Sequence, residues 1–490
     1  MDDDVVWQLW LGRQMNHGFK LYTDLSEVNP PLWFWLARPP VAFADLIHVS
    51  AVMVYRMCLA LYGMVGLGLI WHISNTLKAE DRRAWMISLC LSYYGIGWVF
   101  YGQREHMVFM AVVVYLFLCV RRAEQQPVSM RLALMVGLYA AIAVALKHYF
   151  SLVIIGLELW VLYEQRRCHT TLMRKLLRPE LITLIFCAIV YVLMIILFAP
   201  AYLRDVVPLI RLSYQHYDYP LWTILNERSF FLIITVAIGI FSHTHKPTLV
   251  TRAMLLSAII FFSIVMLQSK GFFYHYFDVY GLIVAVASYQ LITSIQTIRQ
   301  NEYRNIIWSA IMSTVLIAAA GKFLSYALYQ VGSVQFYSNN LASLSNGPVA
   351  LLSSRAAPTI TASQMVRLGW AQRYYTLWMA PLINTPVVEM TPAIRHATDN
   401  LRKTLVDDLL CQPPDILLVD NGKGEHATNA HSIDYIAFFK QDMRFAKLID
   451  QYDRKGDIDY LMVYKERVHQ IGKAGCHSFD SQSIFEGQRK

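Results

Sequence analysis

The stretch that decides the fold is LITLIFCAIVYVLMIILFAP, residues 181–200, which contains no charged side chain. About 20 consecutive apolar residues in a helix are enough to cross the hydrocarbon core of a bilayer. Apolar runs of this kind recur between residues 49 and 329, separated by short charged loops. We therefore predict an α-helical polytopic membrane protein.

The apolar runs predict about ten membrane-crossing helices. They lie at 49–72, 84–100, 107–120, 132–146, 150–163, 181–200, 230–241, 253–268, 279–298 and 306–329. Residues 331–490 have ordinary globular composition, and strand-like runs such as 415–420 and 459–464 predict a small α/β module there. We divide the chain into a transmembrane domain over 1–330, with 1–48 as its first outer loop, and a C-terminal domain over 331–490.

Overall composition agrees with a membrane protein. The chain has 490 residues, of which 56% are hydrophobic and 13% aromatic, which is too apolar for an ordinary soluble enzyme. The formal net charge is +9, but the Lys and Arg residues lie between the apolar runs and not on one face. We therefore expect membrane lipids and no nucleic acid as partners.

The distribution of Lys and Arg also predicts orientation. Basic residues cluster in the loops at 78–83, 121–131 and 166–178, whereas the alternate loops hold few. The positive-inside rule places the basic loops in the cytoplasm, so residues 1–48 and the C-terminal domain are expected in the periplasm of a bacterial inner membrane. For residues 1–48 to lie outside, either a further helix precedes them or the next helix carries a short acidic N-terminus across. We favour an additional first helix.

The seven cysteines show no CxxC or Cys/His spacing typical of a metal site. Only Cys411 and Cys476 fall in the C-terminal domain. They would be able to pair if that domain lies in an oxidising compartment, although sequence alone does not define their geometry.

The first candidate site is the acidic N-terminus, Asp2-Asp3-Asp4, followed by Glu27 and by the aromatic segment PPLWFWL at 30–36. Carboxylates at the start of a helix commonly do no more than complement the helix dipole. An aromatic helix at the membrane interface would, however, hold Asp3 and Asp4 close to the bilayer surface.

The other candidates lie in short outer loops. Arg104, Glu105 and His106 form a charged turn between two apolar helices, where charge costs about 2.5–3.5 kcal/mol per residue and normally faces a cavity or a partner. The plainer alternative is an Arg–Glu pair at a helix end. Lys147 and His148 end another helix, and snorkelling of the lysine would by itself explain its position.

A third outer loop, residues 269–276, combines Lys270 with Tyr274 and His275. A simple aromatic belt would need neither the lysine nor the histidine. Cations gathered on one side of the membrane, near carboxylates, suit a lipid-linked phosphate ligand.

Taken in order, these residues resemble the polytopic GT-C glycosyltransferases that use polyprenyl-phosphate sugars, a superfamily that includes aminoarabinose transferases and protein O-mannosyltransferases. The matching elements are Asp3-Asp4, Trp7, Gly18, Pro30-Pro31-Leu32, the turn at 103–106, the segment at 146–150 and the loop at 270–275. Aminoarabinose transferases carry a Lys before the Pro-Pro pair, whereas this chain has Asn29. The donor phosphate would then fall to Arg104, Lys147 or Lys270.

The resemblance implies an inverting glycosyltransferase that moves a sugar from a polyprenyl-phosphate donor to a hydroxyl of a glycan, lipid or protein acceptor. Asp3 would be the catalytic carboxylate, with Asp4 and Glu105 as competitors. Predicted substrate-binding residues are Glu27, Arg104, His106, Lys147, His148, Lys270, Tyr274 and His275. A divalent metal ion is conceivable but unsupported, because carboxylates adjacent in sequence do not define a coordination shell. Alternatives are a transporter or flippase of lipid-linked sugars, and a polysaccharide ligase or polymerase.

Overall fold

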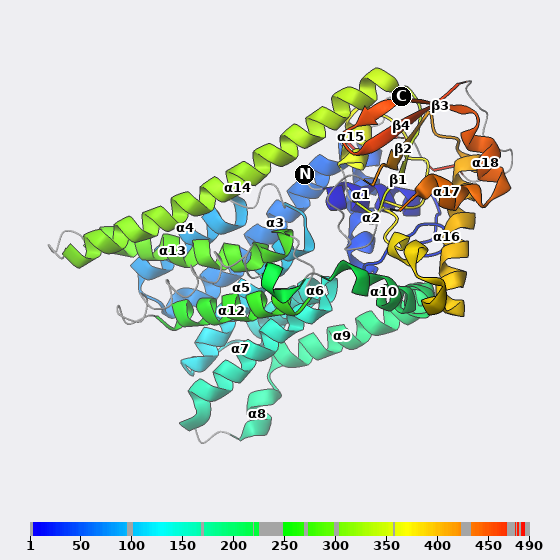
Figure 1. Ribbon diagram of the computed structural model, residues 1–490. Helices are drawn as coiled ribbons and strands as arrows, with labels where there is room; N and C mark the ends of the chain where they lie inside the picture. Colours follow the sequence, from blue (N-terminus) through cyan, green and yellow to red (C-terminus); the bar gives the residue numbers. More distant parts are fainter. Residues whose placement is uncertain are drawn as a thin grey trace. The chain divides into compact units, whose positions relative to one another are not determined.

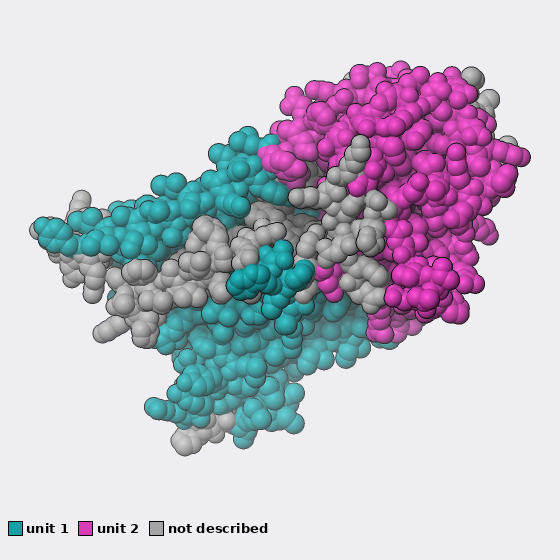
Figure 2. Space-filling view, in the orientation of Figure 1, with its two compact units in different colours: residues 1, 56–194, 219–328 teal, residues 2–55, 195–218, 329–490 magenta. Residues whose placement is uncertain are grey.

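The structure is a computed structural model (Figure 1). It describes residues 3–95, 101–167, 171–218, 220–224, 248–268, 273–297, 303–355, 358–422, 433–467, 476, 478–479 and 482–485. The chain forms two compact units, coloured separately in Figure 2. The membrane unit comprises residues 56–194 and 219–328, and the mixed unit comprises residues 2–55, 195–218 and 329–490. The predicted domain boundary near residue 330 stays a prediction.

All the regular secondary structure described in the membrane unit is helical. Its helices are α3 (Ala51–Ile73), α4 (Ala79–Cys90), α5 (Arg104–Ala123), α6 (Met130–Leu146), α7 (Ser151–Glu164), α8 (Leu172–Leu176), α9 (Pro179–Phe198), α12 (Leu249–Gln268), α13 (Phe277–Thr297) and α14 (Tyr303–Leu344), of which α3, α9 and α14 continue into residues of the mixed unit. Shorter helical turns are η1 (Ser74–Thr76), η2 (Leu91–Gly95), η3 (His148–Phe150), η4 (Gln165–Arg167) and η7 (Phe273–Tyr276).

Among the described residues, six helices are long and apolar enough to cross a membrane, so the chain is a multi-pass membrane protein. They lie at Ala51–Thr76, Arg104–Ala123, Pro179–Phe198, Leu249–Gln268, Phe277–Gln296 and Ile306–Leu344. The predicted span at 230–241 lies outside the described residues, and the span at 84–100 is described only as far as Gly95.

Helix α5 is the centre of the membrane unit. It is apolar on all sides from Met107 to Val120, and it is buried there by α6, α7, α12 and α13. Helix α9 is even more apolar yet almost wholly exposed, as expected of a face that contacts lipid.

Close packing between helices of this unit depends on glycine. A Cβ at Gly281 would lie 2.7 Å from the Phe109 ring, and one at Gly137 would lie 2.8 Å from the Glu180 carbonyl oxygen.

The mixed unit contains a four-stranded sheet of order β1-β2-β4-β3. Its strands are β1 (Val349–Leu352), β2 (Ile416–Asp420), β3 (Tyr452–Ile458) and β4 (Leu461–Glu466). Strands β1 and β2 are parallel, with Val349 opposite Ile416, and the other pairs are antiparallel. Both β1 and β2 are buried along their whole length, which confirms the strand predicted at 415–420 and the α/β character of this region.

Helices complete the mixed unit. They are α1 (Asp3–Asn16), α2 (Leu32–Leu46), α10 (Val207–Ser213), α15 (Thr359–Met365), α16 (Pro392–Cys411), α17 (Tyr435–Lys440) and α18 (Met443–Ile449), with short turns η5 (Tyr202–Val206), η6 (Tyr214–Tyr217), η9 (Ala380–Asn384) and η10 (Val387–Glu389).

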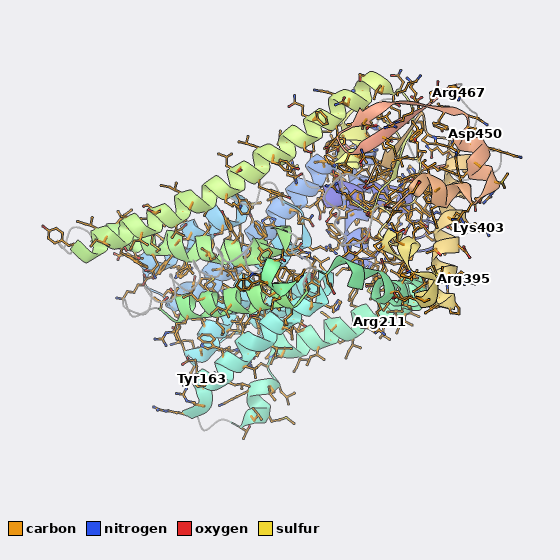
Figure 3. The ribbon with its side chains drawn as sticks, in the orientation of Figure 1. Tyr163, Arg211, Arg395, Lys403, Asp450 and Arg467 are labelled. Atoms are coloured by element: carbon orange, nitrogen blue, oxygen red, sulfur yellow. The ribbon has the colours of Figure 1, made fainter. Side chains whose placement is uncertain are left out.

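Helix α16 lies in the crossover between the parallel strands β1 and β2. It is amphipathic: Leu401 and Leu405 are buried in the core, while Arg395 and Lys403, labelled in Figure 3, are exposed. The Thr391 hydroxyl caps its N-terminus by accepting from the Ile394 N–H at 3.2 Å.

Candidate functional site

Asp3 opens helix α1 and lies within the mixed unit. Its Oδ1 accepts a hydrogen bond from the Thr361 hydroxyl, and its Oδ2 accepts one from the Tyr375 hydroxyl at 3.3 Å. Thr361 lies on α15, which packs against α1. Both donors are neutral, so they orient the carboxylate without cancelling its charge.

The surroundings of Asp3 alter its proton affinity. Burial raises the pKa of the Asp3 carboxyl to about 7, the charge of Asp4 adds to the rise, and the two hydroxyl donors oppose it. A carboxyl group with this pKa exchanges a proton near neutral pH, which is the property that a general base requires.

Glu27 supports the same site. Its Oε2 accepts from the Trp7 indole N–H at 2.8 Å, and its Oε1 accepts from the backbone N–H groups of Val28 and Asn29 at 2.8 and 2.9 Å. Trp7 in turn stacks on the ring of Tyr375, with centroids 5.8 Å apart. Glu27 therefore holds Trp7, and through it the tyrosine that contacts Asp3. Its predicted role in substrate binding stays a prediction.

A second polar cluster lies in the membrane unit, around Glu105. Its carboxylate is fully buried at the start of α5 and forms an ion pair with the Lys147 ammonium from the end of α6. The Nε2 atom of His275, in η7, lies 3.7 Å from Glu105 Oε1. Only 5% of the Lys147 side chain is exposed, so the lysine is buried and paired and does not snorkel.

Asp278, in the first turn of α13, belongs to this cluster and was missed by the sequence analysis. It is fully buried, it interacts electrostatically with Glu105 and Lys147, and neither carboxylate oxygen has a hydrogen-bond partner among the described residues. The predicted outer loop ended at residue 276 and the predicted span began at residue 279, so Asp278 belonged to neither. The signal for Asp278 in the sequence was its position three residues after His275, at the edge of an apolar run.

The remaining predicted residues differ in their surroundings. Arg104 and His106 are buried at the start of α5, and His106 Nε2 lies 2.8 Å from the Tyr93 carbonyl oxygen. His148 is exposed beside the ring of Tyr149. Lys270 and the side chain of Tyr274 lie outside the described part of the chain.

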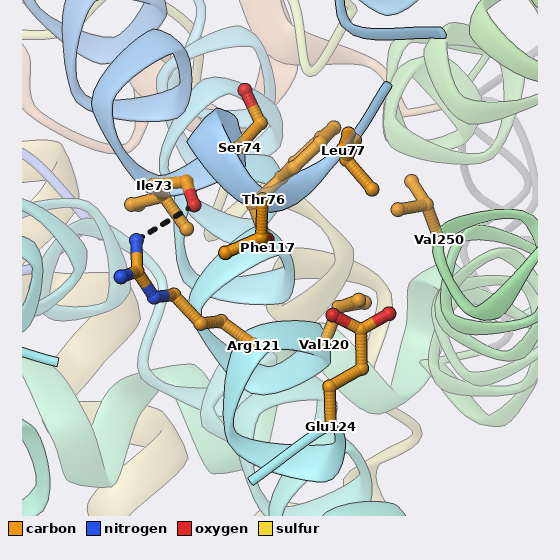
Figure 4. Close-up of a pocket in the computed structure, with 9 residues that line it drawn as sticks. All are labelled: Ile73, Ser74, Thr76, Leu77, Phe117, Val120, Arg121, Glu124 and Val250. Carbon is orange, nitrogen blue, oxygen red and sulfur yellow. Dashed lines mark hydrogen bonds between the residues drawn. The ribbon is translucent and has the colours of Figure 1, made fainter. Parts of the chain in front are cut away.

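The mixed unit thus brings together Asp3, Asp4 and Glu27, and the membrane unit brings together Glu105, Lys147 and His275. Within the described ranges, no group of three His, Cys, Asp or Glu side chains is arranged to hold a metal ion. A small pocket elsewhere in the membrane unit is lined by Ile73, Arg121, Glu124 and their neighbours, and Arg121 Nη1 donates to the Ile73 carbonyl at 3.0 Å (Figure 4). It contains none of the predicted site residues.

Comparison with known proteins identifies the fold. No protein-family model matches the sequence, and no curated protein matches it. Among solved structures, it is similar to the crystal structure of ArnT from Cupriavidus metallidurans bound to undecaprenyl phosphate, with a TM-score of 0.52 and 10% identity over 95% of this chain and 93% of that chain. The apo structure of the same ArnT gives a TM-score of 0.50 at 11% identity, with the same coverage. This likeness confirms the predicted GT-C-like fold.

Proposed function

We propose that this protein is an inverting glycosyltransferase that moves a sugar from a polyprenyl phosphate to an acceptor hydroxyl at the periplasmic face of the inner membrane. The observation that carries the proposal is the Asp3 carboxylate, oriented by Thr361 and Tyr375 and poised to take a proton near neutral pH. The ArnT structure bound to undecaprenyl phosphate supports the choice of donor class.

In the proposed reaction, an Asp3 oxygen takes the proton of the acceptor hydroxyl while the hydroxyl oxygen attacks the anomeric carbon. The bond between that carbon and the phosphate oxygen breaks, and its electron pair leaves with the polyprenyl phosphate. A single displacement inverts the anomeric centre. No metal is needed for this proton transfer.

We infer that the cluster around Glu105 offers groups able to bind a phosphate. A buried ammonium is an effective partner for a phosphate dianion because low dielectric strengthens the attraction. Glu105 fixes the direction of the Lys147 side chain and balances its charge while no phosphate is bound. Arg104 and His275 are the further candidates for phosphate contacts within the membrane unit.

The proposal is tested with purified protein in detergent and a panel of polyprenyl-phosphate sugars. The measurement is release of free polyprenyl phosphate together with glycosylation of added acceptors. Donor binding is measured separately, so that lost chemistry is distinguished from lost binding. Movement of intact donor across liposomes without cleavage would contradict the proposal and favour the transporter alternative.

A further inference from the structure

The described residues near the C-terminus pack onto the N-terminal helices of the mixed unit. We call residues 478–479 and 482–485 the C-terminal strap. The ring of Phe479 packs against Trp10 of α1 and against Phe19, with centroids 5.6 and 5.3 Å away. Ile484 is fully buried. The strap therefore contributes to the core around the helix that carries Asp3.

Hydrogen bonds fix the strap to helices α3 and α15. The Ile484 carbonyl accepts from the Ala51 and Val52 N–H groups at 3.0 and 3.4 Å, so it satisfies N–H groups that the first turn of α3 leaves without helical partners. The Ile484 N–H donates to Gln364 Oε1 at 3.2 Å, on the same helix α15 that supplies Thr361.

Two cysteines lie where the strap begins. Cys411 is the last residue of α16, and the side chain of the next residue, Gln412, accepts a hydrogen bond from the Phe479 N–H at 3.0 Å. Cys476 precedes Phe479 by three residues, so the same contact brings it to the end of α16. The two thiols are neighbours: burial raises the pKa of the Cys411 thiol to about 12, and the Cys476 thiol beside it adds to the rise. Cys476 is exposed, whereas Cys411 is half-buried.

We infer that Cys411 and Cys476 form a disulfide that anchors the C-terminal strap to the end of α16. The inference does not depend on glycosyl transfer, but it does require the mixed unit to face an oxidising compartment. A bond between these positions closes a long loop, which restricts the unfolded chain and so favours the docked strap.

The oxidant would be the disulfide form of a thiol–disulfide oxidoreductase of that compartment. The exposed Cys476 thiolate attacks one sulfur of the oxidant and releases its other sulfur as a thiolate. Cys411 then loses its proton and attacks the Cys476 sulfur of the mixed disulfide, which expels the second thiolate. Two protons and two electrons pass to the oxidant, which becomes a dithiol.

The test uses the full chain isolated from cell membranes, with free thiols alkylated at lysis. Tryptic digestion without reductant should yield peptide 404–423, containing Cys411, linked to peptide 474–489, containing Cys476. Reductant should separate the two. Cys411→Ser and Cys476→Ser should each abolish the link, whereas Cys58→Ser, a change at another exposed cysteine, should leave it intact.

A second measurement covers variants that fold poorly. Reductant should lower the thermal unfolding midpoint of the wild-type protein and leave that of Cys476→Ser unchanged. Recovery of both wild-type peptides in alkylated form would overturn the inference. A link that appears only after an oxidant is added to purified protein would also overturn it, because the bond would then be absent in the cell.

Discussion

Asp3 and Glu105 are both carboxylates in the first turn of a helix, yet their surroundings differ in kind. Asp3 accepts hydrogen bonds from the neutral hydroxyl groups of Thr361 and Tyr375. Glu105 is fully buried and pairs with the ammonium of Lys147. The two residues lie in different compact units.

This difference in surroundings suggests different roles for the two carboxylates, which the sequence alone did not distinguish. The Asp3 carboxylate is oriented by two neutral hydroxyl donors and has its pKa raised to about 7 by burial, whereas the Glu105 carboxylate is engaged in an ion pair with Lys147. Under the proposed function, Asp3 would transfer the proton and Glu105 would hold Lys147 for a phosphate. The predicted catalytic role of Glu105 becomes the competing hypothesis.

The largest expected effect is that of Asp3→Asn. Loss of a general base typically costs about 10²–10⁴-fold, so turnover should fall by that order while donor binding remains. Asp4→Asn is the matched control in the same turn of α1 and should do less. The measurement is sugar transfer by purified variants. Near-normal turnover in Asp3→Asn, with activity abolished in Glu105→Gln, would place the base in the membrane unit instead.

The next effect concerns the buried ion pair. Lys147→Met leaves the buried Glu105 carboxyl without its ammonium partner, and breaking such a pair costs about 3–5 kcal/mol of stability. The double variant Glu105→Gln with Lys147→Met should recover much of that loss, because no uncompensated charge remains. Lys78→Met, at an exposed lysine, is the control and should change the thermal unfolding midpoint little. Equal losses in the single and double variants would show that the pairing is unimportant.

Six of the ten predicted spans coincide with described helices long and apolar enough to cross a membrane, because hydrophobic length is a local property. The apolar run at 107–120 lies within α5, and the run at 181–200 covers most of α9. The sequence did not reveal that α5 is central and that α9 is exposed. Both runs are apolar on all sides, and only packing distinguishes them.

The sequence identified charged candidate residues, but it did not identify the residues that they contact. Glu105 was expected to face a cavity or a neighbouring Arg104, and its observed partner Lys147 is 42 residues away. Thr361 is 358 residues from Asp3, and nothing in the local pattern of either segment marks a hydroxyl that will meet a carboxylate. Such contacts arise from packing between distant segments, which local patterns in a single sequence do not predict.

The pH dependence of turnover should report Asp3 directly. A base must be ionised, and burial raises the pKa of Asp3 to about 7, so turnover should fall as pH decreases below about 7.

The stability of the protein should also depend on pH through the raised pKa of Asp3. An unfolded Asp loses its proton near pH 4, before the folded one, so ionisation disfavours folding increasingly from about pH 4 to about pH 7. Wild-type protein should therefore lose stability relative to Asp3→Asn across that interval, measured by thermal unfolding. A flat difference would contradict the raised pKa.

The smallest expected effect comes from the two hydroxyl groups that contact Asp3. Each donates to the carboxylate and so favours its ionised form, which means that removing either should raise the pKa of Asp3 further. Thr361→Val should then move the acidic limb of the turnover profile to higher pH, and Tyr375→Phe should move it less, because the Thr361 hydrogen bond opposes the rise more strongly. Thr361→Ser keeps the hydroxyl and should restore the wild-type limb. A loss of turnover that is the same at every pH would indicate that Thr361 and Tyr375 only support the packing of α1, with no influence on the base.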